Sequence, residues 1–328
     1  MAKKIAEIGI GKQIVQNDFD HLPIFKEMKR VTDSYGNVFI RIPKFYIRKT
    51  SDGEKLSIQI SKTEIQGSYL PKCFWDFSKN KELPYVDVGA YLASLSVDGT
   101  KLESKAGVKP LVTRNITQFR TLAKANGVGY QQLDIHAVDM LQCLFHVEFA
   151  TLDSQSVHSG YTTGNTESAL TGTTDGVTAS SGAMGAGATF QFMYRGIEDL
   201  WGNVYQWVDG VNILDHQAWV CENAESYQSD IFASPYVKLA YKNSESNIWV
   251  KAMGFDPNRP YAQFPTVGGG NAATYYADHY YQSAGQRVAR FGGAWSSGAS
   301  AGLSFWALNY PSSSVDSTLG GRLLKKPL

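Results

Sequence analysis

Short alternating runs of apolar residues open the patterned part of the chain. Residues 38–42 read Val-Phe-Ile-Arg-Ile and residues 56–60 read Leu-Ser-Ile-Gln-Ile, and a two-residue period is typical of strands with one face against a core. Residues 45–47 continue the first run, and 51–53, Ser-Asp-Gly, supply a turn. The pattern predicts a β-hairpin here, with Pro43 at an edge or a bulge.

The spacing changes to that of helices after residue 113. Apolar residues share one face over 116–123, and Gly127 can end that segment. A second, wider apolar stripe covers 135–149. We therefore expect helices at about 115–126 and 134–149, packed against twisted antiparallel strands. The side chains that can cap the first helix are Thr113, Asn115 and Thr117.

Residues 159–189 are about three-quarters Gly, Ser, Thr and Ala. Such a segment buries little apolar area, so we expect a long mobile or draped loop. The flanking segments have the character of one unit, and the loop is therefore no domain boundary. The prediction is an attachment arm over 1–31 and one ligand-binding domain over 32–328.

Composition excludes several classes of function. Charged residues make up 19% of the 328 residues and the net charge is +1, whereas nucleic-acid binders carry a basic excess. No apolar run approaches the 18 residues of a membrane span, and the first residues lack a signal peptide. The three cysteines, which follow no metal-binding spacing, are Cys73, Cys143 and Cys221. We expect neither nucleic-acid binding nor membrane insertion.

Two longer motifs are more specific. Residues 202–207 read Gly-Asn-Val-Tyr-Gln-Trp, and a second block runs from Arg-Phe-Gly-Gly-Ala-Trp at 290–295 to Leu-Gly-Gly-Arg-Leu at 319–323. Both resemble the signature of the C-type-lectin-like fold of the formylglycine-generating, or sulfatase-modifying, type. The resemblance implies an α+β, loop-rich fold. Within it, Trp201 and Trp207 should be mostly buried and hold the core.

The resemblance extends over nearly the whole chain. Segments 42–46, 107–110, 118–123 and 148–151 are similar to lectin-like proteins of Firmicutes phages and prophages. The enzymatic branch of the fold uses a cysteine pair in its C-terminal block, and residues 290–328 contain no cysteine. The sequence therefore favours a binding protein over an enzyme.

The C-terminal block also resembles, in layout, the variable region of retroelement-diversified proteins, with the major tropism determinant of phage tails as the family example. This resemblance implies an exposed set of ligand-binding residues. Carried over by position, the set is Ser296, Ser297, Ser300, Ser304, Trp306, Asn309, Tyr310, Asp316 and Ser317. Adenine mutagenesis of an asparagine codon reaches Ser, Asn, Tyr and Asp but not Trp. Trp306 is thus either a fixed scaffold residue or a sign that the region is not actively diversified.

Alternation predicts how this block is arranged. Trp295, Leu303, Phe305, Leu308 and Leu319 should point inward, and the polar members of the set should form one exposed patch. Alternation from Ser304 also sends Trp306 outward, as an anchor for a ligand.

These resemblances imply a receptor-binding protein of a phage tail or related apparatus, which attaches to a cell-surface protein or glycan. We expect the arm to contact other tail or baseplate proteins. We also expect a homo-oligomer, a trimer by preference, since several weak sites together bind tightly. The protein would be made in the host cytoplasm and act on the virion tail, outside the cell after lysis.

Two other interpretations remain open: a structural tail or baseplate component without receptor contact, and an enzyme of the formylglycine-generating type. No cofactor is predicted. Lectin-type folds often hold Ca²⁺ through oxygen ligands, which leaves a metal requirement open with three candidates, Asp199, Asp209 and Asp256.

Overall fold

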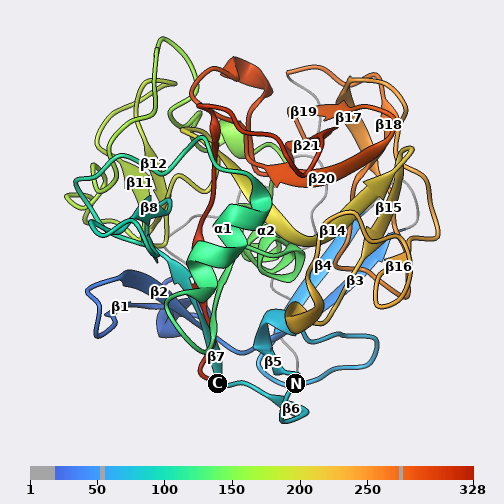
Figure 1. The fold of residues 1–328 in the computed structure, drawn as a ribbon, viewed down its shortest axis with the longest axis horizontal. Helices are drawn as coiled ribbons and strands as arrows, with labels where there is room; N and C mark the ends of the chain where they lie inside the picture. Colours follow the sequence, from blue (N-terminus) through green and yellow to red (C-terminus); the bar gives the residue numbers. More distant parts are fainter. Residues whose placement is uncertain (1–18, 52–55, 273–275) are drawn as a thin grey trace.

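The computed structural model describes residues 19–51, 56–272 and 276–328. In Figure 1 the two helices lie near the centre, with strands β1, β2 and β7 below them and toward the left, β20 and β21 above them and toward the right, and β14 to the right. The predicted α+β class, with two helices against antiparallel sheets, is confirmed. No helix of the described residues is long and apolar enough to cross a bilayer.

Both helices begin at capping side chains. Helix α1 (Ile116–Lys124) starts after Asn115, whose side chain accepts a hydrogen bond from the Gln118 N–H, and Gln118 bonds back to the Asn115 N–H. Helix α2 (Ile135–Phe149) starts after Asp134, whose Oδ1 accepts from the Ala137 N–H at 2.8 Å. These bonds satisfy amide donors that the first helical turn leaves free. The predicted ranges agree with the structure to within two residues.

Helix α2 is more deeply buried than a one-sided stripe predicts. Thirteen of its residues are buried, including polar ones such as His136, Asp139 and Glu148. A helix enclosed on all sides lies at the centre of its domain. Helix α2 contacts strand β4, which precedes it in the sequence, and strand β14, which follows it, and so joins the two halves of the chain.

A five-stranded sheet has the order β1-β2-β7-β23-β10. All its pairs are antiparallel. Its strands are β1 (Lys29–Thr32), β2 (Val38–Pro43), β7 (Tyr85–Gly89), β23 (Leu323–Lys325) and β10 (Tyr130–Gln132). The last residues of the chain thus pair with a strand from its first third, which closes the domain.

The nine-stranded sheet carries the site described below. Its order is β16-β15-β14-β20-β21-β19-β17-β18, and β22 pairs with β14. The strands are β14 (Tyr205–Leu214), β15 (Gln217–Val220), β16 (Val237–Lys238), β17 (Ile248–Met253), β18 (Pro265–Gly268), β19 (His279–Gln282), β20 (Gln286–Phe291), β21 (Trp306–Tyr310) and β22 (Leu319–Gly320). Pairs β19–β21 and β14–β22 are parallel.

Smaller pairs complete the strand inventory. They are β3 (Tyr46–Ser51) with β4 (Leu56–Ser61), β5 (Trp75–Asp76) with β6 (Lys81–Glu82), β8 (Ser94–Leu95) with β9 (Leu102–Glu103), and the sheet of β11 (Ser181–Ala183), β12 (Phe192–Tyr194) and β13 (Ile197–Glu198). The predicted hairpin corresponds to β3 and β4, and its turn residues Asp52 and Gly53 lie outside the described residues. Strand β2 is not part of that hairpin, because it pairs with β1 and β7.

The described part of the predicted arm packs into the domain. Phe19, Ile24 and Phe25 are buried in the main hydrophobic cluster, and β1 pairs with β2. The compact domain therefore starts at or before Phe19, which corrects the start near Thr32. Residues 1–18 lie outside the described residues, and an attachment role for them stays a prediction.

The Gly/Ser/Thr-rich segment 159–189 is mostly irregular apart from strand β11, and it packs against the rest of the structure. Thr162, Ser168, Thr171 and Thr174 in it are buried. Buried Glu198 accepts hydrogen bonds from the amides of Gly172, at 2.7 Å, and Thr174, at 2.9 Å. The main hydrophobic cluster contains residues from both sides of the loop, so this part of the chain folds as one unit.

Candidate functional site

A pocket of about 380 Å³ lies on one face of the nine-stranded sheet. Its floor crosses four neighbouring strands, β14, β20, β21 and β19, and its walls are the loops after β20 and after β21. The volume is in the range of pockets that hold small ligands. The lining residues are Tyr205, Tyr281, Arg290, Ser296, Ser297, Ser300, Asn309, Tyr310, Asp316 and Thr318.

Aromatic rings form much of the floor. The Tyr205 and Tyr281 rings lie 5.5 and 5.6 Å, centroid to centroid, from the ring of buried Phe305. Arg290 on β20 and Tyr310 on β21 line the same pocket. These rings are large and have few rotatable bonds, so they provide contact area at low entropic cost.

Arg290 lies between two of the rings. Its Cζ is 4.3 Å from the Tyr205 centroid and 3.6 Å from the Tyr310 centroid, distances at which a cation is attracted to a ring face. Its Nη2 donates to Asn309 Oδ1 at 2.9 Å. Burial lowers the pKa of Arg290, against opposing effects of Tyr205, Tyr310 and Asp316. The side chain is nevertheless charged at neutral pH, because the ordinary arginine pKa is so high.

The loop of residues 292–305 is one wall, and it begins at two glycines. Gly292 and Gly293 have φ of +91° and +82°, in the left-handed region that glycine adopts without a steric penalty. The Gly292 carbonyl accepts from the Gly202 N–H at 3.1 Å. The paired glycines of the second motif therefore turn the chain away from β20 and against the first motif.

Main-chain atoms hold this loop in place. The Trp295 N–H donates to the Asn203 carbonyl at 2.9 Å, and the Gly298 N–H donates to the Thr162 carbonyl at 2.7 Å. The Leu303 N–H donates to the Ser154 hydroxyl at 2.8 Å.

Other side chains bind the same loop from below. Buried Asp278 accepts from the Ser304 N–H at 2.7 Å, and Gln142 donates to the Leu303 carbonyl at 2.8 Å. Gln155 donates to the carbonyls of Ala299 and Ala301. The anchors reach the backbone of the loop, and the Ser296, Ser297 and Ser300 side chains line the pocket.

The polar wall groups can both donate and accept hydrogen bonds. The hydroxyls of Tyr205 and Ser297 are 3.3 Å apart. Ser300 Oγ donates to the Ser297 carbonyl at 2.6 Å. On the other wall, Asp316 Oδ1 accepts from the N–H and the hydroxyl of Thr318, at 2.8 and 2.7 Å. The pocket thus combines an aromatic floor, a cation and a polar rim.

The predicted residues divide into three groups. Six of the nine line this one pocket: Ser296, Ser297, Ser300, Asn309, Tyr310 and Asp316. Ser317 is exposed beside Asp316 but does not line the pocket. Ser304 and Trp306 are buried, 2% and 1% exposed, and the prediction that they face outward is wrong.

The error at Trp306 has a physical cause. Alternation identifies an outer face only where one side of a strand meets water, and β21 is covered on both sides at this point. Phe305 lies in one hydrophobic cluster, and Trp306 lies in the other, with its ring 5.0 Å from that of Phe264. Ser304 is buried where its amide meets Asp278.

The inward positions are largely as predicted. Leu303, Phe305, Leu308 and Leu319 are all fully buried, whereas Trp295 is only partly buried. Trp295 follows the two glycines, in the loop and not in a strand, so strand alternation does not apply to it.

Sequence reasoning missed four lining residues: Tyr205, Tyr281, Arg290 and Thr318. Tyr205 and Arg290 belong to the two motifs but are not among the nine residues that the resemblance implies as the ligand-binding set. The one local signal for the pocket was Arg290 itself, a charged residue between Ala289 and Phe291 in a strand whose other charged residue is Arg287. Tyr281 and Thr318 carry no local signal, because long-range strand order alone brings them to the pocket.

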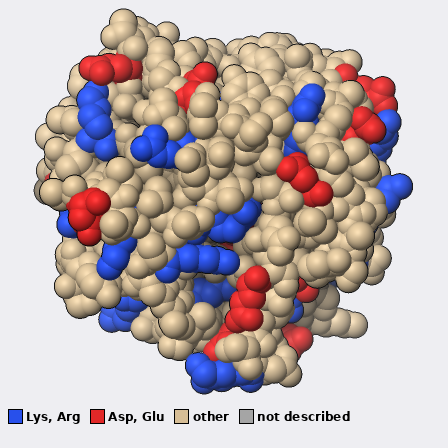
Figure 2. Space-filling model, viewed as in Figure 1, with Lys and Arg blue, Asp and Glu red and all other residues tan. Residues whose placement is uncertain are grey.

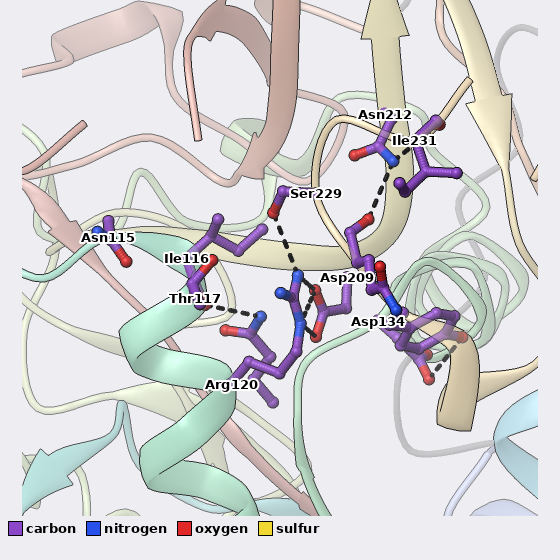
Figure 3. A network of polar contacts seen from close by, with 12 residues as sticks. Asn115, Ile116, Thr117, Arg120, Asp134, Asp209, Asn212, Ser229 and Ile231 are labelled. Carbon is purple, nitrogen blue, oxygen red and sulfur yellow. Dashed lines mark hydrogen bonds and ion pairs between the residues drawn. The ribbon is translucent and has the colours of Figure 1, made fainter. Parts of the chain in front are cut away.

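A second polar cluster fastens helix α1 to β14. Figure 3 shows Arg120 reaching from α1 to Asp209, with Ser229 beyond. The guanidinium donates to both Asp209 oxygens, with distances of 2.5 to 3.1 Å, and to the Ser229 hydroxyl at 3.4 Å. Asp209 lies in a bulge of β14, where the pairing with β20 shifts between Val208 and Asn212. The bulge turns this carboxylate toward the helix.

The three aspartates considered for Ca²⁺ have protein partners. Asp209 pairs with Arg120. Asp199 accepts from Gln191 and Asn203 at 2.7 and 2.8 Å. Asp256 accepts from the amides of Ala240 and Asn258 at 3.1 and 2.9 Å. Within residues 19–51, 56–272 and 276–328, no group of three or more His, Cys, Asp or Glu side chains could hold a metal ion.

The three cysteines are buried and free. Burial raises the pKa of Cys73 and Cys143 above the ordinary value and raises that of Cys221 to about 11. Each is a neutral thiol at neutral pH, whereas nucleophilic cysteines are thiolates. None of the three lines the pocket on the sheet.

Surface charge is sparse and mixed. On the face shown in Figure 2, lysine and arginine groups are interspersed with aspartate and glutamate groups, and most of the surface is uncharged. A ligand that approaches this face meets no broad field of one sign. Recognition there depends on individual charged residues.

No protein-family model and no curated protein sequence matches the chain. Among solved structures, 88% of this chain aligns with three variants named Major Tropism Determinant P3c, I1 and U1. Sequence identity is 12%, 14% and 13%, and the TM-score is 0.36, 0.35 and 0.34, respectively. The alignment covers 63% of each of those chains, so this chain spans less than two thirds of their length.

Proposed function

We propose that this protein is a receptor-binding protein of a phage tail or a related attachment apparatus. Its pocket on the nine-stranded sheet would bind a protein or a glycan on a cell surface. One observation carries the proposal: six residues chosen from the sequence as a ligand-binding set line a single pocket of about 380 Å³. They come from two separate segments, 296–300 and 309–316, which meet only in the folded chain.

The chemistry of the pocket supports binding. Tyr205, Tyr281 and Tyr310 offer rigid amphipathic rings, and the serines and Asn309 offer adaptable hydrogen bonds. Tyrosine with small polar residues is the composition of many natural binding surfaces. A homo-oligomer attached through residues 1–18 would present several such pockets together and so add avidity to each single site.

The proposal is tested by replacing one ring. Tyr310→Ala removes a side chain that lines the pocket. The labelled protein is mixed with intact cells of a panel of bacterial strains, and we expect its binding to the strains that the parent binds to weaken about tenfold or more, as for an aromatic hot spot. The matched control is Tyr35→Ala, since Tyr35 is half exposed and does not line the pocket. Flow cytometry over a concentration series measures both variants.

Two outcomes oppose the proposal. Equal binding by Tyr310→Ala and the parent would mean that the receptor contacts another part of the protein surface. Absence of binding to every strain, together with an internal position in the assembled tail, would favour the structural role that the sequence left open.

A further inference from the structure

Arg290 is a buried cation that forms no ion pair with a carboxylate among the described residues. It is 4% exposed, and its Nε has no hydrogen-bond partner among them. Arg120 and Arg195, which are also largely buried, each bind a buried carboxylate through two nitrogens, whereas fully buried Arg322 donates to the Gln206 side chain and to three backbone carbonyls. For Arg290, the acceptors are the neutral amide oxygen of Asn309 and the Tyr310 hydroxyl, and the Asp316 carboxylate attracts it without forming an ion pair.

A buried charge of this kind is normally paired. The two tyrosine rings attract the guanidinium, but this attraction is weaker than that of a carboxylate. The planar guanidinium matches a carboxylate geometrically and can bind it through two nitrogens. Since Arg290 lines the pocket, a ligand that carries a carboxylate would complete its pairing.

The remaining polar groups suit a ligand with several hydroxyls. Asp316 accepts and Asn309 can both donate and accept, and the hydroxyls of Ser296, Ser297 and Ser300 can do either. Asp316 would repel a second acidic group, so one carboxylate among hydroxyls fits better than a polyanion.

An aromatic ledge continues from the pocket along the sheet. The Tyr281 ring is 4.6 Å from the His279 ring, which is 5.4 Å from the Trp249 ring, centroid to centroid. His279 and Trp249 are directly paired across β19 and β17, and all three are partly exposed. Such a row can stack against the apolar faces of successive sugar rings.

We propose that the pocket binds a sugar acid within a glycan, with the carboxylate on Arg290, the hydroxyls on Asp316 and Asn309, and neighbouring sugars along the Tyr281–His279–Trp249 ledge. This inference rests on the proposed function and names the chemical class of its ligand.

The test compares acids with neutral partners of the same shape. Full-length protein is applied to an immobilised panel of glucuronide, galacturonide and N-acetylneuraminate oligosaccharides, and to the same sugars with each carboxylate converted to a primary amide. We expect at least one acid to bind about tenfold or more tightly than its amide, since hydrogen bonds to charged groups are the strong ones. Arg290→Gln should remove that preference, and Arg287→Gln, on the same strand outside the pocket, should keep it.

The comparison of acid and amide on the unaltered protein stands even if Arg290→Gln fails to fold. Equal binding of acids and amides would overturn the sugar-acid inference. So would cell binding that depends on Tyr310 but survives periodate oxidation of glycans and is lost on protease treatment, because the carboxylate would then belong to a protein. In both cases the receptor-binding proposal survives. If the unaltered protein binds neither cells nor sugars, both the sugar-acid inference and the receptor-binding proposal are overturned.

Discussion

At the scale of single residues, the two tryptophans of the first motif have the roles expected of them. Trp201 and Trp207 are 1% and 0% exposed, and Trp207 Nε1 donates to the Arg114 carbonyl at 3.1 Å. Their rings lie in different hydrophobic clusters, so the seven residues 201–207 join two parts of the core. This is why a short motif marks the fold so specifically.

Replacing either tryptophan should therefore destabilise the protein strongly. For Trp207→Ala and Trp201→Ala we expect a loss of roughly 3–5 kcal/mol in the free energy of unfolding, the cost of removing a large aromatic side chain from a core. Chemical denaturation measures it. Phe190→Ala is the control, since Phe190 is 42% exposed and should change stability by no more than about 0.5 kcal/mol. A tryptophan variant that unfolds with the parent would refute the core role.

A second prediction concerns Asp199. Burial and the neighbouring Glu198 raise the pKa of this carboxyl to about 8. Between the unfolded pKa, about 4, and this value, the folded protein keeps a proton that the unfolded chain releases. The stability associated with Asp199 is thus present at low pH and is lost as the pH rises from about 4 to 8.

Asp199→Asn should remove that dependence. The unfolding free energy of the variant, relative to the parent, should increase between pH 5 and pH 8. Asp98→Asn is the matched control, because hydrogen bonds from Ser96 and Thr100 lower the Asp98 pKa to about 2, outside this window. A constant difference between the Asp199 variant and the parent across these pH values would contradict the prediction.

At the scale of elements, local patterns predicted what local forces determine. Helices α1 and α2 carry their capping side chains and apolar spacing within one short segment, and both were placed correctly. The partners of β2 were not predicted correctly. One of them, β1, lies just before β2, but the other, β7, lies more than forty residues after it, and such pairing leaves no signal in the local sequence. The bulge in β14 likewise has no sequence signal beyond Gly210.

The ion pair at that bulge makes an element-scale prediction. Arg120→Met leaves the Asp209 carboxylate buried without its partner, and we expect a loss of about 3–5 kcal/mol. The double variant Arg120→Met/Asp209→Leu should recover much of it, since no isolated charge remains. Lys242→Met breaks the exposed pair with Glu245 and should cost less than about 1 kcal/mol. Equal losses of unfolding free energy in the single and double variants would mean that the loss comes from packing and not from the unpaired charge.

At the scale of the whole molecule, the candidate site was predicted in part. The motif layout placed two segments at one surface, and six residues of those segments meet there. The other lining residues come from β14, β19 and β20, whose order in the sheet follows from the complete topology and not from any one segment. Trp306 was misplaced for the same reason, because its burial depends on Phe264 and Phe291, which come from other parts of the chain.

The loop of residues 292–305 has a consequence for how this protein can change over generations. The loop is held mainly through its peptide backbone, which every substitution except proline leaves in place, by partners such as Asn203, Ser154 and Asp278 elsewhere in the chain. A mutation at Ser296 alters what the wall presents to a ligand and leaves those bonds intact. Substitutions of the wall side chains can thus change which ligand is bound with little effect on folding, so single mutations can produce new ligand specificities in a protein that still folds.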